Sequence, residues 1–378
     1  MVDSTYNAPG TSRQEQDDAQ SKSFYVPQRV LILRRFRKHR LAMVSLVIVL
    51  FIYFVAIFAE FFAPYPPDLP NSQLPLAPPQ TLHLFQDGRF SPYVNGYTTE
   101  VDAVEMRRTF IIDPEVRIPV GLFVEGYEYK LLGIFTTHTH LIGPTDPEQR
   151  IYLLGADRLG RDQLSRIVYG TRISMSIGLV GVTFSLILGI IIGGISGYYG
   201  GTVDNLIQRL TDFIRSLPTI PLWMGLAAAV PLTWDPLYVY FSITVILSFI
   251  GWTEMARVVR GKFLSLRGED YVRSARLDGA GQFRIMFKYM LPAFTSHIIA
   301  AVTLAIPSMI LAETALSFLG LGLRPPVVSW GVLLKEAQNI RTVAQASWLL
   351  APAVPVIVAV LALNFLGDGL RDAADPYA

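Results

Sequence analysis

The sequence predicts an all-α membrane protein with six transmembrane helices and a small β-rich insert outside the membrane. The first observation is composition: 51% of the 378 residues are hydrophobic and 16% are charged, whereas soluble domains have about 25% charged residues. The second is a set of apolar runs, each long enough to cross about 30 Å of hydrocarbon as a helix. The third is a proline-rich and then β-like stretch between the first two runs.

Each predicted span is an apolar run with few charged residues. Several contain glycine or proline, which transmembrane helices tolerate because neighbouring helices satisfy the freed backbone groups. In the second run, Gly189 and Gly193 form a GxxxG pair, which lets two helices approach closely in lipid. The six spans are residues 41–59, 173–203, 216–234, 236–253, 289–312 and 342–367.

Positive charges set the predicted orientation. Residues 29–63 begin with a basic segment and continue into the first span, and the positive-inside rule places that basic end in the cytoplasm. Six crossings return the C-terminus to the same side, together with the basic residues 254–288. We therefore expect a multi-pass protein of the cell (inner) membrane with both termini cytoplasmic. Residues 1–28, rich in Ser, Gln, Asp and Gly, are expected to be a disordered cytoplasmic tail.

Residues 64–152 are expected to form the extracytoplasmic insert, because a proline-rich start is followed by short β-like runs with turn residues between them. Its role is left between a spacer and a docking surface for an extracytoplasmic partner. His138 and His140 would share one strand face, interpreted as a polar face rather than a metal site. Residues 153–378 then form a five-helix core. Its first segment, 155–174, fits either an interfacial amphipathic helix or an extension of the second span.

The most informative segment is residues 254–292, a basic loop between two uncharged runs. Connectors are usually far shorter, and this one has two parts. The first part is a predicted helix over residues 269–277, whose neighbours at helical spacing form a face with little side-chain bulk. Such a face is suited to insertion into a groove of another protein. It consists of Ser274, Ala275, Asp278 and Gly279.

A break separates the two parts of this loop. Gly279 and Gly281 are expected to take positive φ and to end the first helix. Residues 282–290 are predicted to form a second short helix. Pro292 would sit early in the fifth span, where its missing N–H costs little.

Residues 273–292 resemble the cytoplasmic signature of ABC-importer permeases, which reads Glu-Ala-Ala, then a spaced Gly, then Ile-x-Leu-Pro. Arg273, Ser274 and Tyr289 stand where the signature has Glu, Ala and Ile. Four residues match, namely Ala275, Gly279, Leu291 and Pro292.

The chain is also similar to the second permease of the dipeptide/oligopeptide ABC importer family over residues 29–63 and 150–378. The resembling blocks are LLGADRLGRDQLSRIVYGTRISMSIGL (153–179), GYYGGTVDNLIQRLTDFIRSLPTIPL (197–222), ETALSFLGLGLRPPVVSWGVLL (313–334) and LGDGLRDAADP (366–376).

The resemblance implies a type I permease fold and a non-catalytic subunit that forms the path for peptides. It implies four kinds of partner: a homologous second permease, two cytoplasmic ATPases, an extracytoplasmic solute-binding protein and the lipid membrane. One ATPase would hold Ser274 to Gly279 in a cleft. Oligosaccharides or a nickel chelate remain open as substrates. A different class, an ATP-independent carrier or channel, and a membrane scaffold also remain open.

No catalytic, cofactor or metal site is expected in this chain. Cysteine is absent, and no GxxxxGK[ST] run is present, so ATP and Mg²⁺ are expected on the partner ATPases. The formal net charge of +2 gives no sign of a nucleic-acid partner, because the basic residues are clustered locally. Glu313 must face protein or water, either as a substrate gate or as a cap of the turn that follows. Asn364 could bond to another helix or to a ligand.

Overall fold

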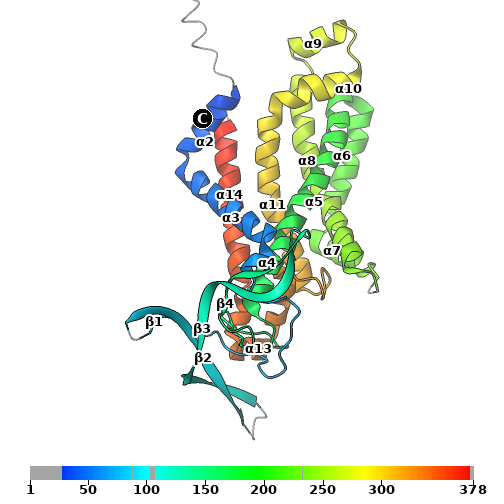
Figure 1. The fold of residues 1–378 in the computed structure, drawn as a ribbon. Helices are drawn as coiled ribbons and strands as arrows, with labels where there is room; N and C mark the ends of the chain where they lie inside the picture. The colour runs from blue at the N-terminus through cyan, green and yellow to red at the C-terminus, as the bar shows by residue number, and fades with distance from the viewer. Residues whose placement is uncertain (1–27, 87, 103–106, 232, 375–378) are drawn as a thin grey trace, which may run out of the picture.

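The computed structural model describes residues 28–86, 88–102, 107–231 and 233–374. It is a helical bundle with a four-stranded sheet at one end (Figure 1). At the other end, α2 (Gln28–Lys38) lies beside the described end of the last helix. The disordered tail predicted for residues 1–28 falls outside the described residues, apart from the start of α2.

Five helical stretches of the described chain are long and apolar enough to cross a membrane. They confirm a mainly helical membrane fold, and each overlaps one predicted span. The stretches are α3 (Arg40–Ile57), α5 (Gln163–Tyr199), α8 (Pro236–Leu266), the run Gln282–Phe318 that ends in α11 (Thr295–Phe318), and Ser347–Ala374, which contains α14 (Ala353–Ala374).

The span predicted for residues 216–234 is corrected by the structure. Its helix, α7 (Thr219–Ala228), has ten residues and covers about 15 Å, half of the hydrocarbon thickness. It follows α6 (Gly201–Ser216), and Pro218 separates the two because the residue before a proline is held extended. Leu217 accordingly has φ −77° and ψ 134°. In Figure 1, α6 and α7 follow one another along the bundle toward the sheet, so together they replace the predicted span.

The second and sixth predicted spans have different starts in the structure. Helix α5, which contains the second predicted span, begins at Gln163. Residues 163–174 are therefore the first part of α5, an extension of that span, and not a separate interfacial helix. Asp162 starts α5 as the N-cap, because its carboxylate accepts the backbone N–H of Ser165 at 2.7 Å. The sixth predicted span starts five residues too early, because a short helix precedes the span-length stretch Ser347–Ala374 and a 3-10 turn begins it. These two elements are α13 (Ile340–Gln345) and η4 (Ser347–Leu350).

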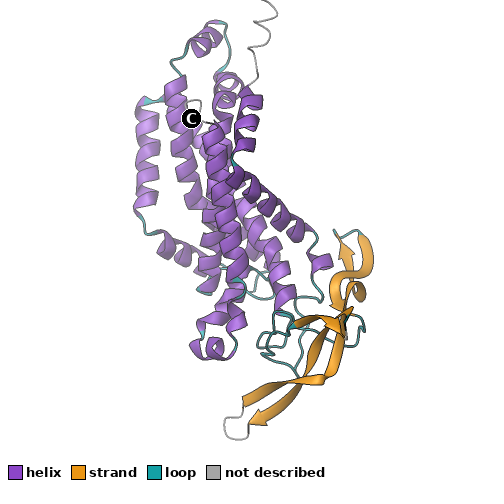
Figure 2. Ribbon diagram, turned by 90° about the vertical axis from the view of Figure 1, so that its left-hand side faces the viewer, coloured by secondary structure: helices purple, strands orange, loops and turns teal. Residues whose placement is uncertain are grey.

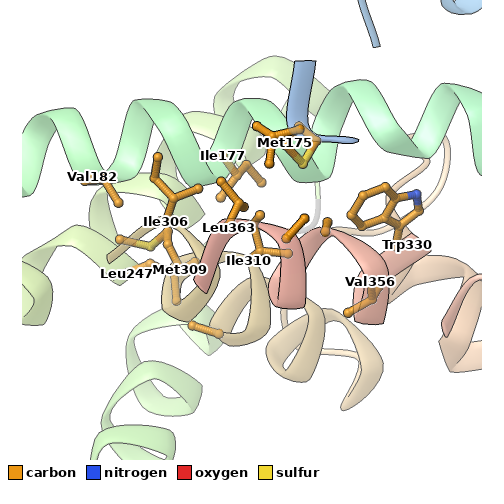
Figure 3. Packing of buried hydrophobic residues seen from close by; sticks show 14 of the residues in the cluster. Met175, Ile177, Val182, Leu247, Ile306, Met309, Ile310, Trp330, Val356 and Leu363 are labelled. Atoms are coloured by element: carbon orange, nitrogen blue, oxygen red, sulfur yellow. The ribbon is translucent and has the colours of Figure 1, made fainter. Parts of the chain in front are cut away.

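Glycines of α5 allow close packing against α8, as the GxxxG pair predicts. Gly193 meets the backbone of Ala256, and Gly189 meets Met255. On α5 nearer the sheet, Gly178 and Gly181 face Ile310 and Met309 of α11. Large side chains then fill the space between α5, α11 and α14 (Figure 3). The labelled members of this core include Met175, Ile177, Val182, Leu247, Ile306, Trp330, Val356 and Leu363.

The β-rich insert is confirmed as a small antiparallel sheet of order β1-β2-β3-β4. It joins the bundle through α4 (Ala59–Phe62), where the ring nitrogens of His140 lie 3.0 Å from the carbonyl oxygens of Glu60 and Tyr127. His138 is exposed. Figure 2 shows the sheet beside one end of the bundle. The strands are β1 (Leu82–Gln86), β2 (Arg89–Asp102), β3 (Arg107–Leu131) and β4 (Phe135–Pro144).

Candidate functional site

The predicted coupling segment, residues 254–292, lies at the end of the bundle opposite the sheet (Figure 1). There α8 ends and two short helices follow, separated by a glycine turn. We call α9, α10 and the turn between them the platform, residues 270–284. The elements are α9 (Asp270–Leu277), α10 (Gln282–Arg284), η1 (Ile285–Met290) and η2 (Leu291–Phe294).

A Schellman motif ends α9, as expected from Gly279. Its φ is +76°, and its N–H donates to the carbonyl of Arg276 at 3.1 Å. The N–H of Ala280 donates to the carbonyl of Ala275 at 3.0 Å, which completes the pair of bonds that defines this cap. The prediction for Gly281 was wrong: its φ is −65°, and it starts α10 as the N-cap.

The underside of α9 packs on the platform's own core. Val272 and Ala275 are buried against Phe263 of α8 and against the η1 residues Ile285 and Met286. Ala275 therefore faces inward, which corrects the predicted small-residue face. Ser274, Asp278 and Gly279 are exposed as that face requires, and so is Arg273.

Two apolar side chains project from the top of the platform. Leu277, the last residue of α9, is 88% exposed, and Phe283 of α10 is 74% exposed. Arginines 273, 276 and 284, each within four residues of one of them along the chain, are also exposed. Sequence reasoning missed both residues, although large apolar side chains inside a basic loop were a visible signal. Protein interfaces commonly combine an apolar core with a polar rim, and the platform exposes residues of both kinds.

Side chains tie the platform to the end of α5. The guanidinium of Arg276 lies 5.7 Å from the ring centre of Tyr198, within the range of a cation–π contact. The hydroxyl of Tyr199 donates to Gln282 Oε1 at 2.5 Å. Because α5 also packs closely on α8, the platform is held to two of the long helices.

The platform continues into the fifth span without a loop. Pro292 lacks an N–H and would clash with the carbonyl four residues earlier in a regular α-helix. Around this proline the chain forms a π-helical stretch, η1, followed by the 3-10 turn η2. Leu291 is half-buried and Pro292 is exposed. The second short helix predicted over residues 282–290 is thus the start of the run that ends in α11.

Below the platform, α6 is joined to α8 by ion pairs. Both carboxylate oxygens of Asp204 accept from Arg260, at 2.5 and 2.6 Å. Further along, Arg257 donates to Asp212 at 3.1 Å. None of the predicted spans covers residues 204–215. The signal for α6 was the spacing of its polar residues, which recur every three or four positions.

Glu313 lies near the sheet end of α11, fully buried. Its Oε1 accepts hydroxyl hydrogen bonds from Ser317 at 2.8 Å and Ser329 at 2.7 Å. Those hydroxyls in turn accept the backbone N–H groups of Leu323 and Val332, at 3.0 and 3.2 Å. The carboxylate therefore organises the turn between α11 and α12 (Trp330–Lys335), which fits the capping alternative better than the gate.

Asn364 lies on α14 and is half-buried. Its helix packs against α3 and α11, so it is placed among helices of the same chain. It lies far along the chain from the platform. The structure thus brings the predicted coupling residues together, and the two path candidates lie on α11 and α14, outside the platform.

Comparison with family models matches residues 186–377 to the binding-protein-dependent transport system inner membrane component. The chain belongs to this family. Residues 28–79 match the N-terminal transmembrane domain of oligopeptide transport permease C. The chain is therefore a multi-pass membrane component of a transport system, and the predicted fold class is confirmed.

Curated relatives agree with this membership. The dipeptide transport system permease protein DppC of Bacillus subtilis (strain 168) is 36% identical over 265 residues, 68% of this chain and 80% of its own length. The oligopeptide permease OppC of the same organism is 34% identical and covers 63% of this chain and 76% of itself. The glutathione permease GsiD of Pectobacterium atrosepticum is 39% identical, covering 59% and 72%.

Proposed function

We propose that the chain is the permease subunit of an ATP-driven importer of peptides. The support is its family and the names of its relatives, which transport dipeptides, oligopeptides and glutathione. Such a subunit hydrolyses nothing itself. Partner ATPases would bind ATP and Mg²⁺, a homologous permease would complete the path, and a solute-binding protein would deliver the peptide.

The platform is the proposed docking site of one ATPase. The single observation that supports this best is the exposure of two large apolar side chains, Leu277 and Phe283, at the end of the bundle opposite the sheet, with exposed arginines next to them in the sequence. A few well-packed side chains near the centre of an interface commonly dominate its binding energy. Arg273, Ser274, Asp278 and Gly279 would complete the contact surface.

Three further signature residues would act from within the platform rather than by contact. Ala275 is small enough to let α9 lie on η1 and α8. Leu291 and Pro292 set the π and 3-10 turns through which the chain enters α11. A displacement of α10 would then move α11 directly, because no flexible loop separates them.

The proposed orientation follows from the same end of the molecule. The platform, α2 and the described end of α14 lie together, opposite the sheet (Figure 1). By the positive-inside rule, the basic residues of α2 support a cytoplasmic position for this end. The sheet would then lie on the extracytoplasmic side, from which the binding protein delivers the peptide.

Reconstituted transport tests the proposal. Liposomes should contain this chain with its second permease and ATPases, and the binding protein should be added outside. We expect uptake of labelled di- and oligopeptides that requires external binding protein and internal ATP. Uptake of an oligosaccharide or a nickel chelate in place of peptide would contradict the proposal that peptides are the substrate. Uptake by the chain without any ATPase would overturn the ATP-driven mechanism.

A further inference from the structure

The turn that joins β3 to β4 is unusually apolar. Hairpin turns normally contain Gly, Asn or Asp, but here the chain reads Leu-Leu-Gly-Ile-Phe over residues 131–135. Ile134 is 73% exposed and Phe135 is 65% exposed, and Leu132 is also exposed. We call Leu132, Ile134 and Phe135 the apolar tip.

The backbone of this turn favours other residues. Leu132 has φ +53° and Gly133 has φ +72°. Glycine takes this conformation freely, whereas a residue with a side chain is strained by roughly 1–2 kcal/mol. An exposed leucine at such a position gains nothing from the turn itself, so its side chain needs another partner.

The strand that leads to the tip contacts the bundle at the level where a bilayer would end. About 30 Å of hydrocarbon is crossed by about twenty helical residues, and a count from Arg40, the start of α3, ends near Phe61. The ring of Phe61 is 6.1 Å from that of Phe123 on β3. In both views the β3–β4 turn lies beside α4 and on its bundle side (Figures 1 and 2). A tilt of α3 would place the turn deeper still.

An unbroken row of aromatic rings connects the hairpin to the outward face of the first span. Phe54 of α3 lies 4.8 Å from Phe58 and 5.7 Å from Phe62. Phe62 lies 5.5 Å from Phe61, which contacts Phe123. The outward face of α3 consists of exposed apolar residues, and on a membrane span such a face meets lipid. Its members are Val44, Val47, Leu50, Phe51, Phe54 and Ile57.

We propose that the apolar tip is inserted into the acyl chains of the leaflet on the sheet side, and that it fixes the insert against the membrane surface. The occupant of this surface is lipid, because the hairpin that carries the tip contacts, through Phe123, the row of rings that leads to the outward face of α3. Lys130 is exposed just before the tip and can reach the headgroup phosphates with its long side chain. This inference needs only that the chain spans a membrane, so it stands apart from peptide import.

Site-specific labelling tests the insertion. The chain contains no cysteine, so Phe135→Cys provides a single thiol for an environment-sensitive fluorophore on the full chain. The matched control is Phe90→Cys on β2, a phenylalanine of similar exposure, 69%, next to β1, which lies away from the bundle in Figure 1. Both proteins would be placed in phosphatidylcholine nanodiscs, with and without nitroxide-labelled acyl chains.

We expect the nitroxide lipids to quench most of the fluorescence at position 135 and to leave position 90 unaffected, whereas iodide in the buffer should do the reverse. Adding Leu132→Asp should reduce the lipid quenching at position 135. Iodide quenching at position 135 would show a water-exposed tip and overturn the proposal. Shielding from both quenchers would show that protein covers the tip, which also overturns it.

Discussion

On α5, Gly193 lies so close to Ala256 of α8 that a methyl group added to Gly193 would stand 2.3 Å from the Ala256 carbonyl oxygen. That atom is backbone and cannot rotate away, so the two helices would have to separate. This separation would also displace the platform, because α8 leads into it and α5 contacts it through Tyr198 and Tyr199.

Gly193→Ala should therefore destabilise the purified protein. Overpacking costs typically about 1–3 kcal/mol, and the thermal midpoint in detergent should fall. Gly261→Ala is the matched control on α8, because nothing lies within 4 Å of the added methyl. Alanine there should leave the midpoint equal or higher, since it favours the helix by about 0.5–1 kcal/mol over glycine. Equal effects of the two changes would contradict the close packing.

Gly279 should be needed for its backbone conformation alone. Nothing lies within 4 Å of a methyl group at this position, but φ is +76°, so Gly279→Ala should cost about 1–2 kcal/mol. Gly281→Ala has equal space and a φ of −65°, and it should be nearly neutral. Hydrogen exchange of the α9 amides measures the difference. Equal protection in both variants would show that the Schellman cap does not hold α9.

Glu313 should matter for stability rather than for substrate choice. Glu313→Ala leaves the hydroxyls of Ser317 and Ser329 without their acceptor, and each unsatisfied buried group costs about 1–3 kcal/mol. Glu313→Gln keeps one acceptor oxygen and should cost less. Thermal unfolding and the yield of folded protein report this order. A fully stable Glu313→Ala protein with altered transport would instead favour the gate.

Asp162 should make stability depend on pH. Burial raises the pKa of this carboxyl to about 6, whereas an unfolded Asp ionises near pH ~4. A raised acid pKa stabilises the fold below the unfolded value, and this contribution is lost as pH rises through the folded value. Asp162→Asn keeps the N-cap acceptor and removes the titration. The variant should gain stability relative to wild type as pH rises from about 4 to about 7, measured as thermal midpoints. A constant difference would argue against the raised pKa.

Much of the architecture could be predicted because it depends on local pattern. Apolar runs predicted five of the helical stretches. The glycine spacing predicted the close contact of Gly193 with α8, and Gly279 predicted the end of α9. The replacement of the third predicted span by the two helices α6 and α7 could not be predicted. The first of them, α6, has charged residues such as Asp204 that pair with α8, so hydropathy alone does not mark it as part of the bundle.

The platform shows a second limit of sequence reasoning. The small-residue face was derived from helical spacing, which says which residues are neighbours but not which way the helix is turned. Packing of Val272 and Ala275 on Phe263 fixes that rotation, and it exposes Leu277 instead. The rotation depends on contacts between distant parts of the chain, so the periodicity of a helix as short as α9 does not reveal it.

The proposed entry of ATPase movement through the platform is tested most directly by binding of the ATPase subunits. Leu277→Asp with Phe283→Asp should abolish co-purification of the ATPase and ATP-dependent uptake, while the variant still elutes as a folded protein. Ile340→Asp is the matched control, because Ile340 is 84% exposed on α13 at the sheet end, and it should leave ATPase binding intact. An ATPase that remains bound and coupled to the platform variant would contradict the account.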